Sequence, residues 1–222
     1  MTAKPRPPVV LNDKRLADAT RSVAKLDSDM ARILAGLGTP PLWAREAGFA
    51  TLVRIILEQQ VSLASADAMF RRLTGHIEPL TPATVIAAGV PFLRSLGVTR
   101  QKAAYFQYVA EAIQNGDLDL QALALESDES AIEKLTSVKG IGPWTAKIYL
   151  LMVLCRPDVW PVGDVALATA VKNLKGLPRR PTQPELSEIA LSWCPYRATA
   201  ARMLWHYYLS GMQATVGKVE NK

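Results

Sequence analysis

The sequence predicts an all-α protein of about ten helices. Apolar residues recur at helical spacing from the first segments onward, and Leu16, Ala19 and Val23 fall on one face of a helix. Small polar residues that cap helices, such as Ser62 and Thr99, stand directly before several periodic segments. No stretch alternates apolar and polar residues over the length that a sheet needs. These three observations together favour helices alone.

The helices can be placed in chain order from their periodicity and from the residues that begin and end them. Proline suits the first turn of a helix, and glycine suits the position just after the last turn. On these grounds we expect two helices between residues 11 and 37, one at 49–60, one capped by Ser62 and ending near 73, two short ones starting at Pro82 and Pro91, and others at 100–115, 127–137, from Pro143 onward, 165–174, 185–193 and 197–209.

The composition indicates a globular protein. With 222 residues, 49% of them hydrophobic, the chain can form one large domain or two small ones that share a core. Its longest apolar run, residues 148–155, is far shorter than the ~20 residues of a membrane span. Residues 1–10 are rich in proline, lack the apolar segment of a secretion signal, and are expected to form a flexible tail. We therefore expect a cytoplasmic protein with no membrane partner.

Cysteine and histidine are too few for the usual metal centres. Cys155 and Cys194 lie in apolar or aromatic surroundings and are expected to be buried thiols. Two cysteines do not supply the four ligands of an iron–sulfur cluster. His76 and His206 are far apart in the sequence and show no zinc-ligand spacing.

The positive charge is concentrated in the C-terminal part of the chain. Residues 1–133 hold 14 Lys and Arg against 15 Asp and Glu, whereas residues 134–222 hold 12 against 5. The whole net charge of +6 therefore comes from the second segment. Such a basic region suits a polyanion, although a solvated surface without a partner is the alternative.

A paired-glycine segment, Val138-Lys139-Gly140-Ile141-Gly142-Pro143, opens this basic part of the chain. Both glycines can adopt positive φ, and neither carries a Cβ that would block a close approach. Their amides and the start of the next helix would form an anion site beside Lys139 and Lys147. The alternative is a simple connector between two helices. The flanking apolar residues favour a helix–hairpin–helix motif, which grips nucleic-acid backbone without reading sequence.

Three motifs carry a family resemblance. They are Gly-Ile-Gly-x-Trp-Thr-Ala at 140–146 with a lone Asp164 in a Val-x-Asp context, Ile-Leu-Glu-Gln-Gln-Val-Ser at 56–62, and Cys-Pro-Tyr-Arg-Ala at 194–198. Together they resemble the helix–hairpin–helix DNA glycosylase superfamily, and within it the 3-methyladenine DNA glycosylase II branch. The resemblance runs from about residue 49 to residue 209.

The resemblance implies a two-lobed helical fold without an iron–sulfur cluster. A central lobe at 48–157 would contain the helix–hairpin–helix at about 128–154. Residues 11–47 and 158–213 would form the second lobe, and 214–222 would be a tail. In the family, the active-site cleft lies between the lobes.

Asp164 is the candidate catalytic residue. A glycosylase flips the target base out of the duplex and breaks the bond between the base and C1′ of deoxyribose. The sugar then acquires oxocarbenium character, which a fixed carboxylate stabilises while it orients or deprotonates the attacking water. The alternative role of Asp164 is to cap the helix that begins at Val165, and the two roles are compatible.

The resemblance also assigns residues that would contact DNA. Gln59 and Gln60 lie in the link that enters the minor groove, where Gln60 would occupy the position of the wedge. The alternative is an exposed polar turn between two helices. Carbonyl oxygens of Thr136, Val138 and Ile141 would hold a Na⁺ or K⁺ ion at the hairpin, and no other cofactor is required. The residues expected to hold the DNA backbone are Lys139, Gly140, Ile141, Gly142, Trp144, Thr145 and Lys147.

The base pocket would be less aromatic than in some relatives. Tyr196 stands where the family has an aromatic residue that stacks on the flipped base, with packing at a helix start as its alternative role. Trp144 and Trp160 are nearby in the sequence, with packing as their alternative role. Ile148 and Val165 replace tyrosines of the pocket, which argues against a broad substrate range that includes 7-methylguanine or hypoxanthine. The remaining candidates are 3-methyladenine and 1-methyladenine.

The expected activity is hydrolysis without strand cleavage, in base excision repair. Bifunctional relatives carry a nucleophilic lysine at the position of Trp144, and its absence predicts a monofunctional enzyme. The partner would be double-stranded DNA with alkylated bases, bound by a monomer that associates with the nucleoid when it acts. The alternatives are a glycosylase for another lesion, such as uracil, and a non-catalytic DNA-binding module.

Overall fold

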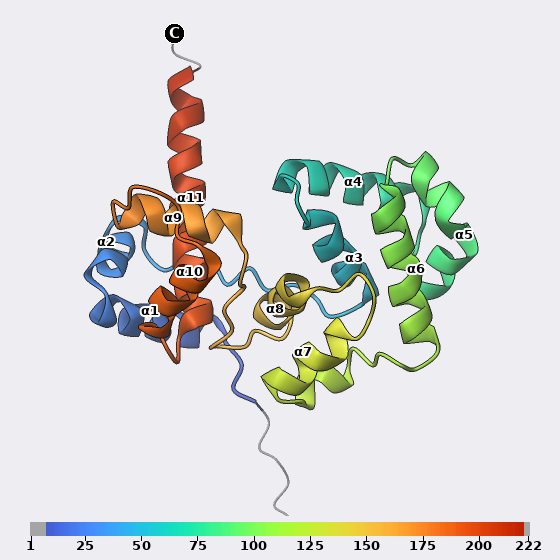
Figure 1. Cartoon of the computed structure of the whole chain (residues 1–222), viewed down its shortest axis with the longest axis horizontal. Helices are drawn as coiled ribbons and strands as arrows, with labels where there is room; N and C mark the ends of the chain where they lie inside the picture. The colour runs from blue at the N-terminus through green and yellow to red at the C-terminus, as the bar shows by residue number, and fades with distance from the viewer. Residues whose placement is uncertain (1–7, 220–222) are drawn as a thin grey trace, which may run out of the picture. The chain divides into compact units, whose positions relative to one another are not determined.

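The computed structural model describes residues 8–219 of the chain, with side chains as far as residue 211. This part of the chain contains eleven α-helices, one short 3₁₀ helix and no strand, which confirms the predicted all-α class (Figure 1). None of its helices combines the length and the apolar character that crossing a membrane would require.

The chain divides into two compact units. The central unit is Arg45–Leu154 and contains α3 to α8. The terminal unit joins Val9–Ala44, with α1 and α2, to the chain from residue 155 onward, with α9 to α11. The central unit thus begins and ends a few residues before the expected limits of 48 and 157.

The central unit is built from helices whose first turns are capped as the sequence predicts. Ser62, Thr81, Thr99 and Ser127 each accept a hydrogen bond from an amide of the following turn. At Gly89, with φ of 70°, the helical backbone is interrupted, so α5 consists of the two short pieces expected from the prolines. The elements are α3 Phe49–Glu58, α4 Leu63–His76, α5 Pro82–Ser95, α6 Arg100–Gln114, the 3₁₀ helix Ala122–Leu125, α7 Asp128–Thr136 and α8 Pro143–Met152.

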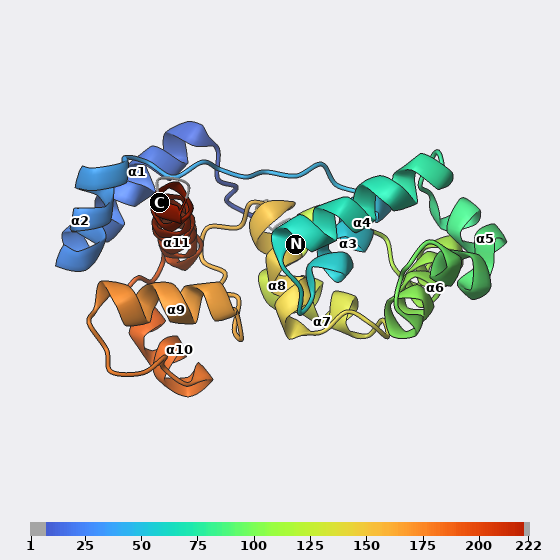
Figure 2. The same cartoon turned by 90° about the horizontal axis from the view of Figure 1, so that it is seen from above.

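The core of the central unit forms around α8. This helix packs against α3 and α7, and α3 also packs against α6 (Figures 1 and 2). Ile148 and Tyr149 of α8, together with Leu52 and Ile55 of α3, are fully or almost fully buried.

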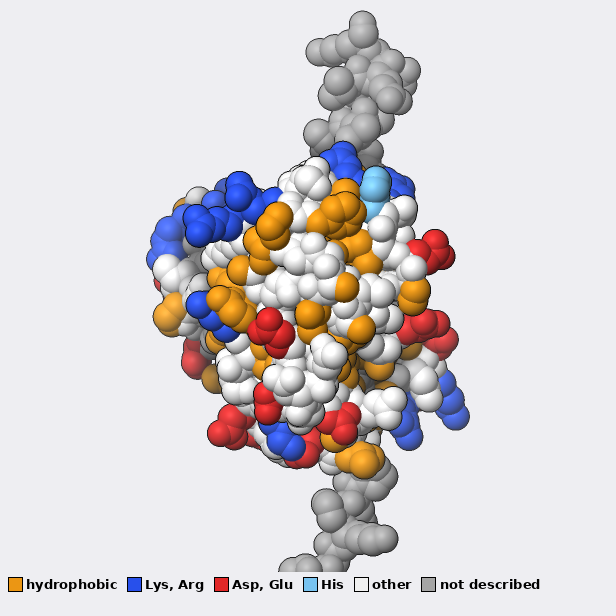
Figure 3. All heavy atoms as spheres, turned by 90° about the vertical axis from the view of Figure 1, so that its right-hand side faces the viewer, with side chains coloured by type: hydrophobic (Ala, Val, Ile, Leu, Met, Phe, Trp, Pro, Cys, Tyr) orange, Lys and Arg blue, Asp and Glu red, His pale blue; other side chains and the backbone are white. Residues whose placement is uncertain are grey.

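On the face of the molecule shown in Figure 3, hydrophobic side chains are scattered among polar ones, and Lys and Arg lie mainly around the margin. This face therefore presents no large apolar patch.

The terminal unit is organised around its last helix. The elements are α1 Asp13–Leu26, α2 Ser28–Leu37, α9 Val165–Leu174, α10 Gln183–Leu191 and α11 Arg197–Val219. Helices α1, α2, α9 and α10 all contact α11. Arg202 of α11 is fully buried, and it donates from Nε to the carbonyl oxygen of Leu42 at 2.8 Å. Burial lowers the pKa of Arg202 to about 10.

An acidic side chain ties three helical segments of this unit together. Asp27 caps α2 through Oδ1, and its Oδ2 accepts from Lys175 Nζ at 2.9 Å and from Trp193 Nε1 at 3.0 Å. Burial raises the pKa of Asp27, but the hydrogen bonds from Lys175 and Trp193 outweigh it and hold that pKa below its usual value. The ionised carboxylate therefore stabilises the unit.

Some boundaries differ from the prediction. Helix α11 continues to Val219, so the tail expected at 214–222 was wrong as far as residue 219. Helix α10 begins at Gln183 with Pro184 in its first turn, earlier than the expected start at 185. The expected flexible tail at 1–10 lies largely outside the described residues, as do 220–222 of the C-terminal tail.

The two cysteines have different environments. Cys155 is buried, as predicted, and burial raises the pKa of its thiol. Cys194 is exposed, so the prediction of a second buried thiol was wrong. Its Sγ donates to Asp158 Oδ2 at 3.2 Å, and the same carboxylate pairs with Arg197 at the start of α11.

Candidate functional site

The paired-glycine segment forms a tight hairpin between α7 and α8. The amide of Ile141 donates to the carbonyl oxygen of Val138 at 3.1 Å, and both side chains are buried, which anchors the turn. Gly140 has φ of 103°, the left-handed conformation that favours glycine. Gly142 has φ of −87° and ψ of 174°, so of the two glycines only Gly140 uses the positive φ that glycine permits. Pro143 explains the difference, because a residue before proline is restricted to extended conformations.

The hairpin presents main-chain donors at the start of α8. Gly142 occupies the N-cap position, and no side chain there accepts from the first turn of α8. Neither Gly140 nor Gly142 donates its amide hydrogen to another described residue. Exposed amides and the positive end of the helix dipole together attract an anion. Lys139 is exposed and Lys147 is half-buried, so both add positive charge to this region.

Gln59 joins the turn after α3 to the hairpin. Its Nε2 donates to the carbonyl oxygen of Gly140 at 3.2 Å and to Thr145 Oγ1 at 2.8 Å. The expectation that this link is exposed was therefore wrong for Gln59, which is half-buried. The side chain of Gln60 is exposed, and its backbone adopts the left-handed conformation with φ of 57°. Of the two expected wedge residues, Gln60 is therefore the more exposed.

A lysine holds the other side of this turn. Lys102 Nζ donates to the carbonyl oxygens of Leu57 at 2.7 Å and Gln59 at 2.8 Å, which are left without helical partners at the end of α3. Burial lowers the pKa of Lys102. The turn that carries Gln60 is thus held by Lys102 on one side and by the hairpin on the other.

Asp164 is the N-cap of α9, and its carboxylate is fixed by two donors. Oδ1 accepts from the amide of Leu167 at 2.9 Å and from Trp205 Nε1 at 3.3 Å. Trp205 belongs to α11 and is 9% exposed, so its indole is held by the packing of the terminal unit. The capping role of Asp164 is therefore confirmed. The same contacts orient a carboxylate, as the chemical role would require.

The expected pocket residues are divided between the two units. In the terminal unit, Trp160 is buried against Trp193, with ring centroids 5.6 Å apart, and Tyr196 is half-buried near the start of α11. Val165 is 62% exposed in the first turn of α9. In the central unit, Trp144 is half-buried in the first turn of α8, and Ile148 is 2% exposed.

The carbonyl oxygens expected to bind a cation lie around the hairpin. The carbonyl oxygen of Val138 accepts the amide of Ile141 and keeps a second lone pair. Within the described residues, no group of three or more His, Cys, Asp or Glu side chains could hold a metal ion. A cation at this hairpin would therefore depend on main-chain oxygens such as those of Thr136, Val138 and Ile141.

Three contributors to these arrangements had no signal in the sequence. Lys102, Tyr105 and Trp205 belong to no motif, and their partners are distant in the chain. Tyr105 packs directly beneath the hairpin, where a Cβ added to Gly140 would lie 2.5 Å from its Cγ. Besides its positive φ, Gly140 therefore provides the space that the ring of Tyr105 occupies.

Most of this arrangement lies within a stretch of the chain that matches the model of a known protein family. The model for the HhH-GPD superfamily of base excision DNA repair proteins matches residues 53–196. The chain belongs to this superfamily. The matched stretch includes Gln60, the hairpin, Asp164 and Tyr196. The match covers most of the central unit and, in the terminal unit, helices α9 and α10.

Individual HhH-GPD proteins are similar over most of their length. DNA-3-methyladenine glycosylase 1 of Schizosaccharomyces pombe is 30% identical over 158 residues, which cover 69% of each chain. The solved structure of the S. pombe 3-methyladenine DNA glycosylase Mag1 in complex with abasic DNA has a TM-score of 0.78 at 28% identity, over 85% of this chain and 95% of that one. A DNA-3-methyladenine glycosidase from Bacillus halodurans has a TM-score of 0.73 at 31% identity, over 86% of this chain and 88% of that one.

Proposed function

We propose that this HhH-GPD protein is a monofunctional DNA glycosylase that removes alkylated bases, with 3-methyladenine as the main substrate. The observation that carries the proposal is the carboxylate of Asp164, which two protein donors hold in one orientation at the start of α9. The similarity to DNA-3-methyladenine glycosylases of S. pombe and B. halodurans supports the substrate class.

In this proposal the two units have different tasks. The hairpin of the central unit holds a phosphate through the amides of Gly140 and Gly142, and Gln60 fills the space that the extruded base leaves. Asp164 of the terminal unit stabilises the positive charge that develops on the sugar and orients the water that attacks C1′. Trp205 acts as a positioning residue, because it donates to Asp164 without touching the substrate.

The charge of the leaving base determines whether the reaction needs a general acid. Methylation at N3 or N7 gives a purine a positive charge, so the base leaves without a strong general acid. An electron-rich ring such as Tyr196 favours a cationic base by stacking and by cation–π attraction. Trp144 stands where bifunctional relatives have a lysine, so the chain has no amine there to form a Schiff base. The product is therefore an intact abasic site.

The remaining parts of the proposal concern partners and cofactors. The protein acts on double-stranded DNA as a monomer in the cytoplasm, and no organic cofactor or redox centre is required. A Na⁺ or K⁺ ion held by carbonyl oxygens at the hairpin would lie between the protein and a phosphate. Its contribution would be electrostatic, since it would offset the charge of that phosphate.

The test is release of free base from methylated duplex DNA, analysed by chromatography. The expected result is free 3-methyladenine, with no strand cleavage and no covalent adduct after borohydride treatment. Release of uracil from uracil-containing DNA, with no base released from methylated DNA, would make uracil the substrate in place of alkylated bases. Duplex binding without any base release would make the chain a non-catalytic DNA-binding module. Strand cleavage with borohydride trapping would overturn the monofunctional assignment.

A further inference from the structure

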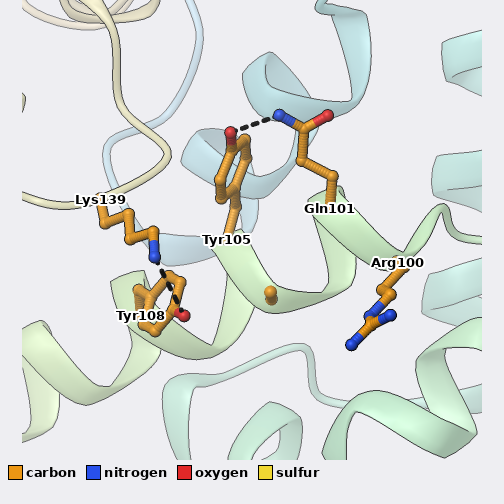
Figure 4. A pocket seen from close by; sticks show the side chains of 6 residues that line it. Arg100, Gln101, Tyr105, Tyr108 and Lys139 are labelled. Carbon is orange, nitrogen blue, oxygen red and sulfur yellow. Dashed lines mark hydrogen bonds between the residues drawn. The ribbon is translucent and has the colours of Figure 1, made fainter.

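A groove of about 400 Å³ lies beside the hairpin, within the central unit (Figure 4). Its lining comes from the first three turns of α6 and from one residue of the hairpin. The lining residues are Arg100, Gln101, Ala104, Tyr105, Tyr108 and Lys139. Lys139 is the residue that the groove shares with the hairpin.

Lys139 and Tyr108 form a pair that leaves hydrogen-bond donors unused. Lys139 Nζ lies 3.4 Å from Tyr108 Oη and 4.8 Å from the centroid of the same ring. An ammonium group has no lone pair, so the hydroxyl oxygen must accept in this contact. The phenolic hydrogen of Tyr108 is therefore available to another acceptor. Because Lys139 keeps further N–H groups, the pair offers a cation and a hydroxyl donor together.

The rest of the groove has the same character. Gln101 Nε2 donates to Tyr105 Oη at 2.5 Å, which leaves the hydrogen of that hydroxyl free to donate as well. Arg100 is exposed and forms no ion pair with a described residue. No Asp or Glu belongs to the lining. A groove with two cations, two hydroxyl donors and no carboxylate favours a ligand that is anionic and rich in acceptors.

The positions of the two cations indicate how large that ligand is. Lys139 and Arg100 lie on opposite sides of the two tyrosines (Figure 4). One small anion at Lys139 would therefore leave Arg100 unused. Tyr105 also fixes the groove to the hairpin, because its ring fills the space beside Gly140 that a Cβ would occupy. The hairpin amides and the groove thus form one continuous surface, which suits an extended polyanion.

We propose that this groove binds the sugar–phosphate backbone of the DNA strand that the hairpin holds, beyond the phosphate at the hairpin itself. Lys139 and Arg100 contact successive parts of the strand, and Tyr108 donates to a phosphate oxygen. The proposal rests on the proposed function, since it assumes that the hairpin binds DNA. It adds a second, sequence-independent contact that lengthens the footprint along α6.

The test uses the salt dependence of binding to a duplex with a stable abasic-site analogue, measured by fluorescence anisotropy. Each phosphate contact by a cation adds about 0.9 to the slope of log K against log salt concentration. We expect Arg100→Gln to lower that slope by about 0.9. The matched control is Arg94→Gln, because Arg94 is an exposed arginine of the same unit that lies outside the groove. This control should keep the wild-type slope.

A second variant separates hydrogen bonding from charge. Tyr108→Phe keeps the ring beneath Lys139 but removes the hydroxyl. We expect it to weaken binding roughly tenfold at every salt concentration and to leave the slope unchanged. Thermal denaturation of each variant checks that the fold is intact, and both side chains are accessible enough for substitution.

The outcomes distinguish this proposal from the proposed function. If the wild-type protein releases methylated bases and Arg100→Gln and Tyr108→Phe bind like Arg94→Gln, the groove proposal is overturned and the enzyme assignment stands. If the wild-type protein neither binds the duplex nor releases base, the proposed function is overturned, and the groove proposal that rests on it is overturned as well. A lower slope for Arg100→Gln alone supports the cationic contact and excludes the hydroxyl contact of Tyr108.

Discussion

Replacing Asp164 by asparagine separates its structural role from its chemical role. Asparagine caps helices about as well as aspartate, and its side-chain oxygen can still accept from Leu167 and Trp205. We therefore expect Asp164→Asn to change the free energy of unfolding by less than about 0.5 kcal/mol. The negative charge is lost, however. Removal of one electrostatic contact to a transition state costs on the order of 10² to 10³ in rate, or about 3–4 kcal/mol.

Asp164→Ala provides the contrasting variant. Loss of the cap costs about 1 kcal/mol. The buried N–H of Trp205 also loses its acceptor, which costs about 1–2 kcal/mol more. For a chain of this size, a loss of about 2–3 kcal/mol lowers the Tm by roughly 5–10 °C. Alanine should therefore reduce both stability and activity, whereas asparagine should reduce activity alone.

The assay is single-turnover release of base from methylated duplex DNA, with binding to an abasic-site analogue measured alongside. The Asp164→Asn protein should bind this DNA as tightly as the wild type, or more tightly, because a negative charge near the strand is removed. Base release at the wild-type rate by Asp164→Asn would refute the chemical role. A large fall in Tm for the asparagine variant would refute the argument from capping.

Two other predictions follow from the contacts within each unit. Gly140→Ala should lower the free energy of unfolding by about 1–3 kcal/mol and weaken duplex binding, because its Cβ would meet the ring of Tyr105 and its φ is 103°. Gly142→Ala is the matched control in thermal denaturation, because Gly142 has φ of −87° and open space around it. It should lower the free energy of unfolding far less. The pKa of Asp27 is held below its unfolded value, so its stabilising contribution should be complete above pH ~4 and decline as the pH falls through the lower folded pKa. Acid unfolding of Asp27→Asn should show a shallower pH dependence in that range than the wild type, and an identical profile would contradict the pairing with Lys175.

Local features of the fold could be predicted because short sequence signals determine them. Helix α9 spans Val165–Leu174 as expected, since the cap at Asp164 and the apolar periodicity agree. The end of α11 was predicted at residue 209, too early, because the helix continues through Ser210 and Gly211. Glycine lowers helix stability by only about 1 kcal/mol, which one continuous helix can tolerate.

The site was predictable where motifs exist and unpredictable where distant side chains meet. The hairpin and the cap at Asp164 follow from adjacent residues. By contrast, the contacts of Lys102 with the end of α3, of Tyr105 with Gly140, and of Trp205 with Asp164 join segments far apart in the chain. Only the packing of each unit brings these partners together, and a single sequence carries no local sign of it.

The hydrogen bonds of Gln59 limit how parts of this protein can be exchanged with relatives. A chimaera whose incoming residues 59–62 carry no amide side chain at position 59 would lose the donor to Gly140 and Thr145. The hairpin would then keep two acceptors without their partner. The transferable module therefore consists of both segments, the turn and the hairpin, moved as a pair. Directed evolution of the turn alone should accordingly recover second-site changes at residues 140–145.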